Sequence, residues 1–246
     1  MNYTFDNFRE LIINSNLRDD EKTAVFDFDG TLIKGDIEEA FFCYLLSKNY
    51  NLEYSWDEYN HLLELGEYKK AYLDMKQSFS RISIPQLKIE INNFLNENID
   101  FIKFKQNDKD YNYKYPIVND TLYQIVKFLE ENNFRIFVIS ASLEMLVQEA
   151  GFARFGINKE SVAGMRLKPI DDKTFSKEIT DIVTIGAGKV DALKTYFNIE
   201  RPFLVAGDSI SDLELLNSVQ DNGIKIIVGK NQKLLEKMEK GKILIV

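Results

Sequence analysis

The stretch that decides the fold is Thr23-Ala24-Val25-Phe26-Asp27-Phe28-Asp29-Gly30-Thr31-Leu32, an apolar run that ends in a turn rich in carboxylates. An apolar run without polar alternation is typical of a parallel strand that helices cover on both faces. Similar runs, each followed by a polar or glycine-bearing turn, occur at 135–139, 203–206 and 224–228. Helical patterns alternate with these runs at 119–132, 143–153, 189–197, 212–219 and 232–240. This alternation predicts a Rossmann-like, doubly wound α/β fold with a mostly parallel sheet.

The segment 34–115 interrupts this alternation. It contains amphipathic helical patterns with no strand-like run between them, at 37–46, 56–65, 68–79 and 85–95. We therefore expect a smaller helical cap domain at 34–115, inserted into a core of 1–33 and 116–246, with the polar stretch 106–113 as the return linker. Elsewhere we expect a helix near the N-terminus, a hairpin or loop at 165–179 and a last strand at 243–246.

The composition restricts the possible functions. Of 246 residues, 45% are hydrophobic, and 31 basic against 39 acidic residues give a net charge of −8. This composition is typical of a folded globular protein, and the acidic balance argues against nucleic acid as a partner. No apolar run reaches the roughly 20 residues that span a bilayer, and the N-terminal residues lack a signal-peptide pattern, so we expect a cytoplasmic protein without a membrane partner. One histidine and one cysteine argue against Ser-His-Asp, Cys-His and histidine-rich zinc sites.

Carboxylates follow the predicted strands at the end where α/β sheets bind their ligands. Asp27 and Asp29 follow the first strand, beside a glycine, Gly30, that lets backbone N–H groups approach an anion. Asp208 and Asp212 follow a later strand. Such a cluster needs a cation or a proton to compensate it. Taken alone, each pair also fits an ordinary solvated turn or a helix N-cap.

Hydroxyl and lysine side chains accompany these carboxylates. Ser140-Ala141-Ser142 follows the second core strand and precedes a helix, so it offers a hydroxyl and amide groups to phosphate oxygens, or an ordinary N-cap at Ser142. Gly186-Ala187-Gly188-Lys189 opens a later helix. It is not a P-loop, because Val183 replaces the first glycine and Val190 replaces the serine or threonine. Taken alone, its lysine fits a surface charge.

In this order, the features resemble the signature of the haloacid dehalogenase-like hydrolase superfamily: Asp-x-Asp-Gly-Thr, a strand-terminal Ser or Thr, a Lys, and an acidic pair after Gly. The position of the cap, with the motifs at 138–142, 188–190 and 207–212, looks most like the phosphoserine-phosphatase-like branch. Dehalogenases of this superfamily lack an acid at the second aspartate position and transport ATPases carry threonine there. Asp29 therefore favours a phosphatase or a phosphomutase.

The resemblance implies that Asp27 attacks phosphorus and becomes an aspartyl-phosphate, while Asp29 protonates the leaving oxygen and then deprotonates water. It also implies a Mg²⁺ site formed by Asp27, the backbone carbonyl of Asp29 and Asp208, with Asp212 in or near the coordination shell. The residues that it assigns to phosphate binding are Ser140, Lys189, Thr31, Gly30 and Ala141.

Substrate recognition in this family falls to the cap. Arg81, an isolated arginine of the predicted cap, is a candidate for binding a substrate carboxylate, although arginines on helices usually form surface ion pairs. Glu38, with Asp36 and Glu39, is placed to meet a substrate amine or to act as a favourable acid in the first turn of a helix. Phosphoserine or a similar small phosphorylated metabolite is the resulting candidate substrate.

The sequence thus predicts a Mg²⁺-dependent phosphatase that hydrolyses a small phosphomonoester through an aspartyl-phosphate. A phosphomutase of the same superfamily is the alternative enzyme. A catalytically inactive ligand-binding module is the alternative from another class. The full set of candidate catalytic residues argues against this last alternative, since an inactive site has no chemical need for all of them.

Overall fold

The computed structural model describes residues 4–180, 182–239 and 241–246 of the chain. Its central sheet has the strand order β11-β10-β9-β1-β6-β7-β8, with β8 antiparallel to β7 and the other neighbours parallel. This mostly parallel sheet confirms the predicted fold class. Its strands are β1 (Thr23–Phe26), β6 (Arg135–Leu143), β7 (Val162–Pro169), β8 (Phe175–Thr180), β9 (Leu204–Gly207), β10 (Ile224–Ile227) and β11 (Lys242–Ile245).

Helices cover both faces of the sheet, which explains its apolar strands. Ala24 and Phe26 belong to one hydrophobic cluster and Val25 to another, because alternate strand residues point to opposite faces. The first cluster includes α1, α6 and α7, and the second α8, α9 and α10. The predicted helix at 232–240 ends earlier, and Lys240 lies outside the described residues. These helices are α1 (Phe5–Ile13), α6 (Asp120–Glu131), α7 (Glu144–Phe155), α8 (Ala187–Phe197), α9 (Leu213–Asn217) and α10 (Gln232–Lys237).

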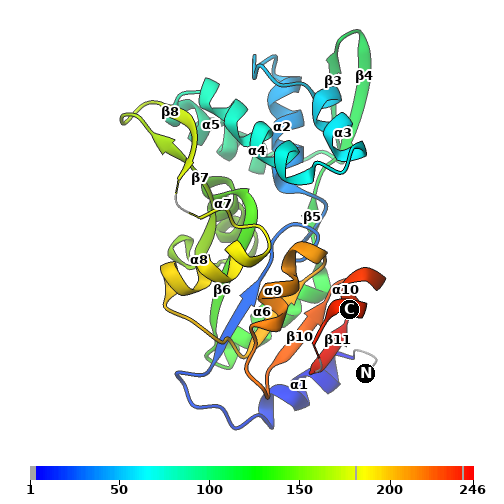
Figure 1. Ribbon diagram of the computed structural model, residues 1–246, viewed down its shortest axis with the longest axis vertical. Helices are drawn as coiled ribbons and strands as arrows, with labels where there is room; N and C mark the ends of the chain where they lie inside the picture. The colour runs from blue at the N-terminus through cyan, green and yellow to red at the C-terminus, as the bar shows by residue number, and fades with distance from the viewer. Residues whose placement is uncertain (1–3, 181, 240) are drawn as a thin grey trace.

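The elements from α2 to β4 form a separate group at one end of the long axis (Figure 1). The chain leaves and re-enters the core through β2 (Ile33–Lys34), which pairs antiparallel with β5 (Ile117–Val118). On the basis of this arrangement, we propose a cap at 34–115 and a core at 1–33 and 116–246. The group contains α2 (Ile37–Ser47), α3 (Trp56–Glu64), α4 (Tyr68–Ser78), α5 (Ile84–Leu95), β3 (Phe101–Gln106) and β4 (Lys109–Lys114).

The prediction of a linker at 106–113 is wrong, because β3 and β4 form an antiparallel hairpin there. Ile102 and Phe104 are buried on β3 while the residues between them are exposed, which is the alternation of a half-buried strand. The turn residues Asn107 and Asp108 have φ values of 51° and 60°. Asparagine and aspartate tolerate this left-handed conformation better than other side chains, so the sequence suits a tight hairpin turn. The cap is therefore not purely helical.

Elements near the end of the chain follow the predictions. The segment 165–179 lies within the antiparallel pair β7–β8, and the predicted last strand is β11, parallel to β10. In the described ranges, none of the helices has the length and apolar character that crossing a bilayer requires.

The register of the sheet brings the predicted site residues together. Phe26 of β1 pairs with Val138 of β6 and with Ala206 of β9. The residues that follow these positions therefore lie side by side at the carboxyl edge of the sheet, where α/β folds bind ligands.

Candidate active site

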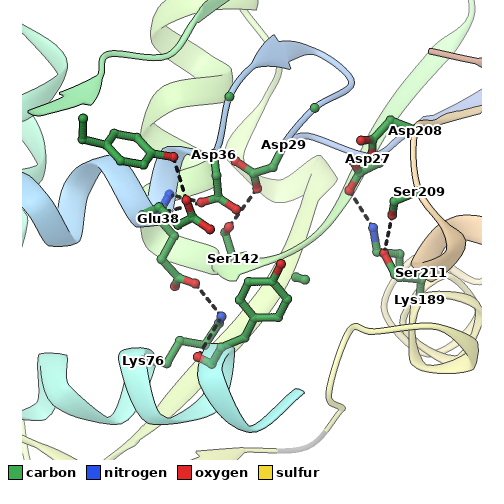
Figure 2. Close-up of a pocket in the computed structure, with 16 residues that line it drawn as sticks. Asp27, Asp29, Asp36, Glu38, Lys76, Ser142, Lys189, Asp208, Ser209 and Ser211 are labelled. Carbon is green, nitrogen blue, oxygen red and sulfur yellow. Dashed lines mark hydrogen bonds and ion pairs between the residues drawn. The ribbon is translucent and has the colours of Figure 1, made fainter. Parts of the chain in front are cut away.

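A pocket of about 380 Å³ lies at this carboxyl edge, between the sheet and the cap. Figure 2 shows Asp29 with Asp36 and Glu38 on one side of it and Asp27 and Asp208 on the other. The residues lining the pocket from the core are Asp27, Asp29, Gly30, Ala141, Ser142, Lys189, Asp208, Ser209 and Ser211. Those lining it from the cap segment are Gly35, Asp36, Glu38, Glu39, Tyr72, Lys76 and Tyr113.

Asp27 occupies the base of this pocket and is 4% exposed. Its Oδ1 accepts a hydrogen bond from Lys189 Nζ at 2.6 Å, and its Oδ2 accepts one from Thr31 Oγ1 at 3.0 Å. The same ammonium group donates to Asp212 Oδ1 at 2.6 Å. Lys189 is 1% exposed and lies near the start of α8, so the helix carries its charge directly into the cluster. Both oxygens of Asp27 thus have fixed partners.

The carboxylates around Lys189 are short of positive charge. Oxygen atoms of Asp27, Asp208 and Asp212 lie within 4.8 Å of one another. Burial and the nearby Asp212 raise the pKa of Asp27 well above its ordinary value, although Lys189 opposes this shift. Burial and Asp212 likewise raise the pKa of Asp208 to about 7. A divalent cation would compensate these charges, and oxygen ligands of this kind suit Mg²⁺, so the donor set fits this ion.

Glycines let the carboxylate-bearing loops approach one another. Gly30 has a φ of 73°, and a Cβ at this position would collide with the carboxylate of Asp208. At Gly207, a Cβ would lie 2.6 Å from the Cβ of Asp212. Gly30 is therefore required by the close approach of Asp208 and by its left-handed backbone, and Gly207 by the close approach of Asp212.

Asp29 has different surroundings from Asp27. Its Oδ1 accepts a hydrogen bond from the backbone N of Ile37 at 2.7 Å. Its Oδ2 accepts from Ser142 Oγ at 2.8 Å and from Ser140 Oγ at 3.0 Å. Burial raises the pKa of Asp29, while these hydrogen bonds lower it. The carboxyl group is thus held between the first helix of the cap and the end of β6.

The end of β6 differs from the expectation of an N-cap at Ser142. The strand continues to Leu143, which is itself the N-cap residue of α7 and makes no side-chain capping bond. The carboxylate of Glu38 accepts a hydrogen bond from the backbone N of Leu143 at 2.8 Å. A carboxylate from the cap therefore occupies the N-terminus of α7, where the helix dipole favours negative charge. This leaves the Ser142 hydroxyl free to bind Asp29.

Among the described residues, one carboxylate on the cap side of the pocket forms an ion pair, and two others accept hydrogen bonds from neutral groups. Glu38 forms a 2.5 Å ion pair with Lys76, and these side chains are 3% and 1% exposed. Glu39 accepts hydrogen bonds from Tyr59 Oη at 2.5 Å and from Tyr113 Oη at 2.8 Å. Asp36 accepts from backbone N–H groups of α2 as its N-cap. Burial raises the pKa of all three carboxyl groups.

The structure brings most of the predicted site residues together. Thr31, Ser140 and Asp212 are buried beside the pocket residues that they contact. Arg81 does not line the pocket, since it pairs with Glu53 and is half exposed. Predicted residues that line the pocket are Asp27, Asp29, Gly30, Glu38, Ala141, Lys189 and Asp208.

Three further side chains that line the pocket, Tyr72, Lys76 and Tyr113, were not predicted from the sequence. None of them belongs to a motif. The spacing of Tyr72 and Lys76 is the one available signal, because residues four apart on a helix share a face.

Comparisons with known proteins agree with this geometry. A family model described as haloacid dehalogenase-like hydrolase matches residues 24–217. No curated protein matches the chain.

Solved structures share the fold at low sequence identity. A conserved, functionally unknown protein from Anaerococcus prevotii DSM 20548 is 18% identical, with a TM-score of 0.65 over 91% of this chain and 84% of that chain. A phosphoserine phosphohydrolase-like protein from Francisella tularensis subsp. tularensis SCHU S4 is 20% identical, with a TM-score of 0.57 over 89% and 94% of the two chains. A substrate-bound phosphoserine phosphatase is 13% identical, with a TM-score of 0.57 over 90% and 92%.

Proposed function

The chain belongs to the haloacid dehalogenase-like hydrolase family and is a hydrolase, and we propose that it is a Mg²⁺-dependent phosphatase that acts on a small phosphomonoester. The observation that carries this proposal is the position of Asp27. Its carboxylate accepts hydrogen bonds from Lys189 and Thr31. Asp27 also lines the pocket together with Asp29 and Asp208. This set contains a nucleophile, a cationic phosphate ligand and an acid, which phosphoryl transfer requires.

In the first half of the proposed reaction, a carboxylate oxygen of Asp27 attacks phosphorus. The bond between this oxygen and phosphorus forms while the bond from phosphorus to the ester oxygen breaks. Asp29 donates its proton to the departing alcohol oxygen. Lys189, 2.6 Å from Asp27 Oδ1, is placed to stabilise the negative charge on the transferring phosphoryl oxygens.

In the second half, water replaces the alcohol. Asp29, now a carboxylate, accepts a proton from this water as the water oxygen attacks phosphorus. The bond from phosphorus to Asp27 then breaks, which releases inorganic phosphate and restores the carboxylate. One residue acts as acid and then as base, so the reaction needs no histidine.

The carboxylates of Asp27, Asp208 and Asp212 would hold the metal, with the backbone carbonyl of Asp29 as a further oxygen ligand. Bound Mg²⁺ supplies charge neutralisation for the phosphoryl oxygens and for the clustered carboxylates. Gly30 and Ala141 line the pocket, which supports the proposal that backbone amides of these two motifs bind phosphoryl oxygens.

The position of Arg81 weighs against phosphoserine, the candidate from the sequence. A cation at the pocket would favour binding of an amino acid carboxylate, whereas Arg81 pairs with Glu53 outside the pocket. Lys76 does line the pocket, but Glu38 already neutralises it. The proposed substrate is therefore a phosphomonoester in general, and its alcohol part is considered below.

The test of the proposal is release of inorganic phosphate by the purified protein with Mg²⁺ and simple phosphomonoesters. We expect Asp27→Asn to abolish turnover, because the amide is not a nucleophile, and to keep the wild-type circular dichroism spectrum. The matched control is Asp172→Asn, an exposed aspartate outside the pocket, which should keep full activity. Undiminished turnover in Asp27→Asn would overturn the mechanism. Phosphate release without a bisphosphate activator would separate a phosphatase from a phosphomutase.

A further inference from the structure

A second cavity, of about 830 Å³, adjoins the active-site pocket. Tyr72, Ser209 and Ser211 line both cavities, so the two meet at these residues. Figure 2 shows both serines on the side of the pocket that carries Lys189 and Asp208. The second cavity, which we call the α4 groove, thus opens at the end of the pocket where the phosphoryl group would bind.

The walls of the α4 groove are mostly apolar. On the cap side, α4 buries Ala71 and Met75 in the cap and turns Tyr68 and Leu73 towards the groove. On the core side, Ile210 projects from the turn between Asp208 and Asp212 and is 44% exposed. Single exposed apolar residues are common on proteins. Here, however, side chains from separate elements face the same cavity.

The charged residues that line the groove are two acidic and two basic side chains, Glu67, Asp74, Lys69 and Lys70. Lys70 and Asp74 of α4 form a 2.6 Å ion pair one helical turn apart. The groove therefore offers an apolar surface with no concentrated charge, in contrast to the carboxylate-lined pocket beside it. Ligand sites of several hundred cubic ångströms with apolar walls and a polar anchor at one end are typical of small-molecule binding.

We infer that the α4 groove binds the alcohol part of the substrate, and that this alcohol has an extended apolar body, an alkyl chain or an aromatic ring. The inference rests on the proposed phosphatase function. A phosphoryl group in the pocket would place its ester substituent near Tyr72, Ser209 and Ser211, and an apolar chain that extends past them would contact Leu73 and Ile210. A short polar alcohol would leave this surface unused, whereas each buried methylene group favours binding by about fourfold.

The test is a series of primary alkyl phosphates, ethyl, butyl and hexyl, whose alcohols have nearly the same acidity. We expect kcat/KM of the wild type to rise by about tenfold or more from ethyl to hexyl phosphate. Leu73→Ala and Ile210→Ala should each lower the hexyl-to-ethyl ratio by about threefold or more. Ile89→Ala is the matched control, because Ile89 is 51% exposed on α5 and lies outside the groove; it should keep the wild-type ratio.

A second measurement separates binding from chemistry. Alkyl phosphonates are not hydrolysed, so the change of their dissociation constants with chain length, measured by calorimetry with the wild type, reports binding of the alkyl chain without the chemical step. Affinity should increase from ethyl to hexyl phosphonate, with a negative heat-capacity change from apolar burial.

A hexyl-to-ethyl ratio near one for both kcat/KM and phosphonate affinity would overturn the inference. Equal losses for ethyl and hexyl phosphate in both groove variants would also overturn it, since they would show that the groove serves closure of the cap. Either result, if obtained while phosphate release still depends on Asp27, leaves the proposed function standing. Turnover that persists in Asp27→Asn overturns the proposed function itself.

Discussion

The carboxylates of Asp27 and Asp29 lie two positions apart in the chain but have different partners. Asp27 contacts an ammonium group and a threonine hydroxyl, whereas Asp29 contacts a backbone amide and serine hydroxyls. Two carboxyl groups in different environments can take the separate roles of nucleophile and acid. This contrast supports the division of roles that we propose.

We predict that Asp29→Asn lowers kcat by about 10²–10⁴-fold for alkyl phosphates, because their alcohol must be protonated as it leaves. The loss should be much smaller for the first step with 4-nitrophenyl phosphate, whose phenolate leaves without a proton. The measurement is the burst of nitrophenol in rapid mixing, compared with single-turnover hydrolysis of ethyl phosphate. Equal losses for both esters would contradict the role of Asp29 as the acid.

The residues at the strand ends could be predicted because a motif gives their spacing and a parallel sheet gives their location. Asp27 and Asp208 each follow a strand and Ser140 lies near the end of another, and these neighbouring strands share one continuous register. Lys76 and Tyr113 could not be predicted in this way. They reach the pocket through packing of the cap, which depends on contacts between segments far apart in the chain.

At the scale of elements, Glu38 connects the cap to the core. Its carboxylate, on α2, binds Lys76 of α4 and the backbone N of Leu143 at the start of α7. Burying an ion pair is costly in itself, but removing one partner leaves an uncompensated charge. Lys76 therefore stabilises the link between these helices mainly because Glu38 is already buried.

We predict that Lys76→Met lowers the free energy of unfolding by about 3–5 kcal/mol at neutral pH, measured in urea. The control Lys88→Met, at an exposed site of α5, should change it by less than about 0.5 kcal/mol. In the double variant Glu38→Gln/Lys76→Met, part of the loss should be recovered, because the buried charge is gone. A double variant whose loss equals the sum of the single losses would contradict the link.

The loss in Lys76→Met should also depend on pH. Burial raises the pKa of Glu38 and Lys76 opposes this shift, so removal of Lys76 raises this pKa further. The folded variant then holds a proton at a higher pH than the unfolded chain, and lowering the pH favours the folded state. The stability deficit relative to the wild type should shrink as the pH falls from about 8 to about 5. A deficit that grows over this range would contradict the assignment.

The hairpin β3–β4 lies where the sequence predicts a linker, although its sequence contains signs of two strands and a turn. Its strands alternate apolar or aromatic residues with polar ones, and Asn107-Asp108 stands between them. The signal of a hairpin was thus present in the sequence, but the high polarity of the segment favoured a linker. The helices of the cap, by contrast, have regular apolar periodicity and are found where it predicts them.

At the scale of the whole molecule, the structure shows where some of the acidic residues behind the net charge of −8 lie. Carboxylates that follow two strands, β1 and β9, line one pocket together with carboxylates of the cap, so part of the acidic excess lies at the proposed metal site. The composition argues against a nucleic acid partner, but it could not show where the negative charge lies in the structure. That required the sheet register, which places distant motifs at one edge.

We predict that Mg²⁺ stabilises the protein through this cluster, by about 2.7 kcal/mol at a concentration 100 times the dissociation constant. Thermal unfolding with and without the ion measures the effect. The shift should be lost in Asp208→Asn, and this variant without metal should melt no lower than the wild type, since a repelling charge has been removed. Asp172→Asn should keep the full shift. An unchanged shift in Asp208→Asn would contradict the metal site.

The central claim is that the phosphoryl group is transferred to Asp27. Rapid quenching during turnover, followed by borohydride reduction and peptide mapping by mass spectrometry, locates an acyl phosphate because only the phosphorylated carboxyl group is reduced to the alcohol. We predict reduction at Asp27, dependent on substrate and absent in Asp27→Asn. Reduction at Asp29 or Asp208 instead, or at no aspartate while phosphate is being released, would contradict the account.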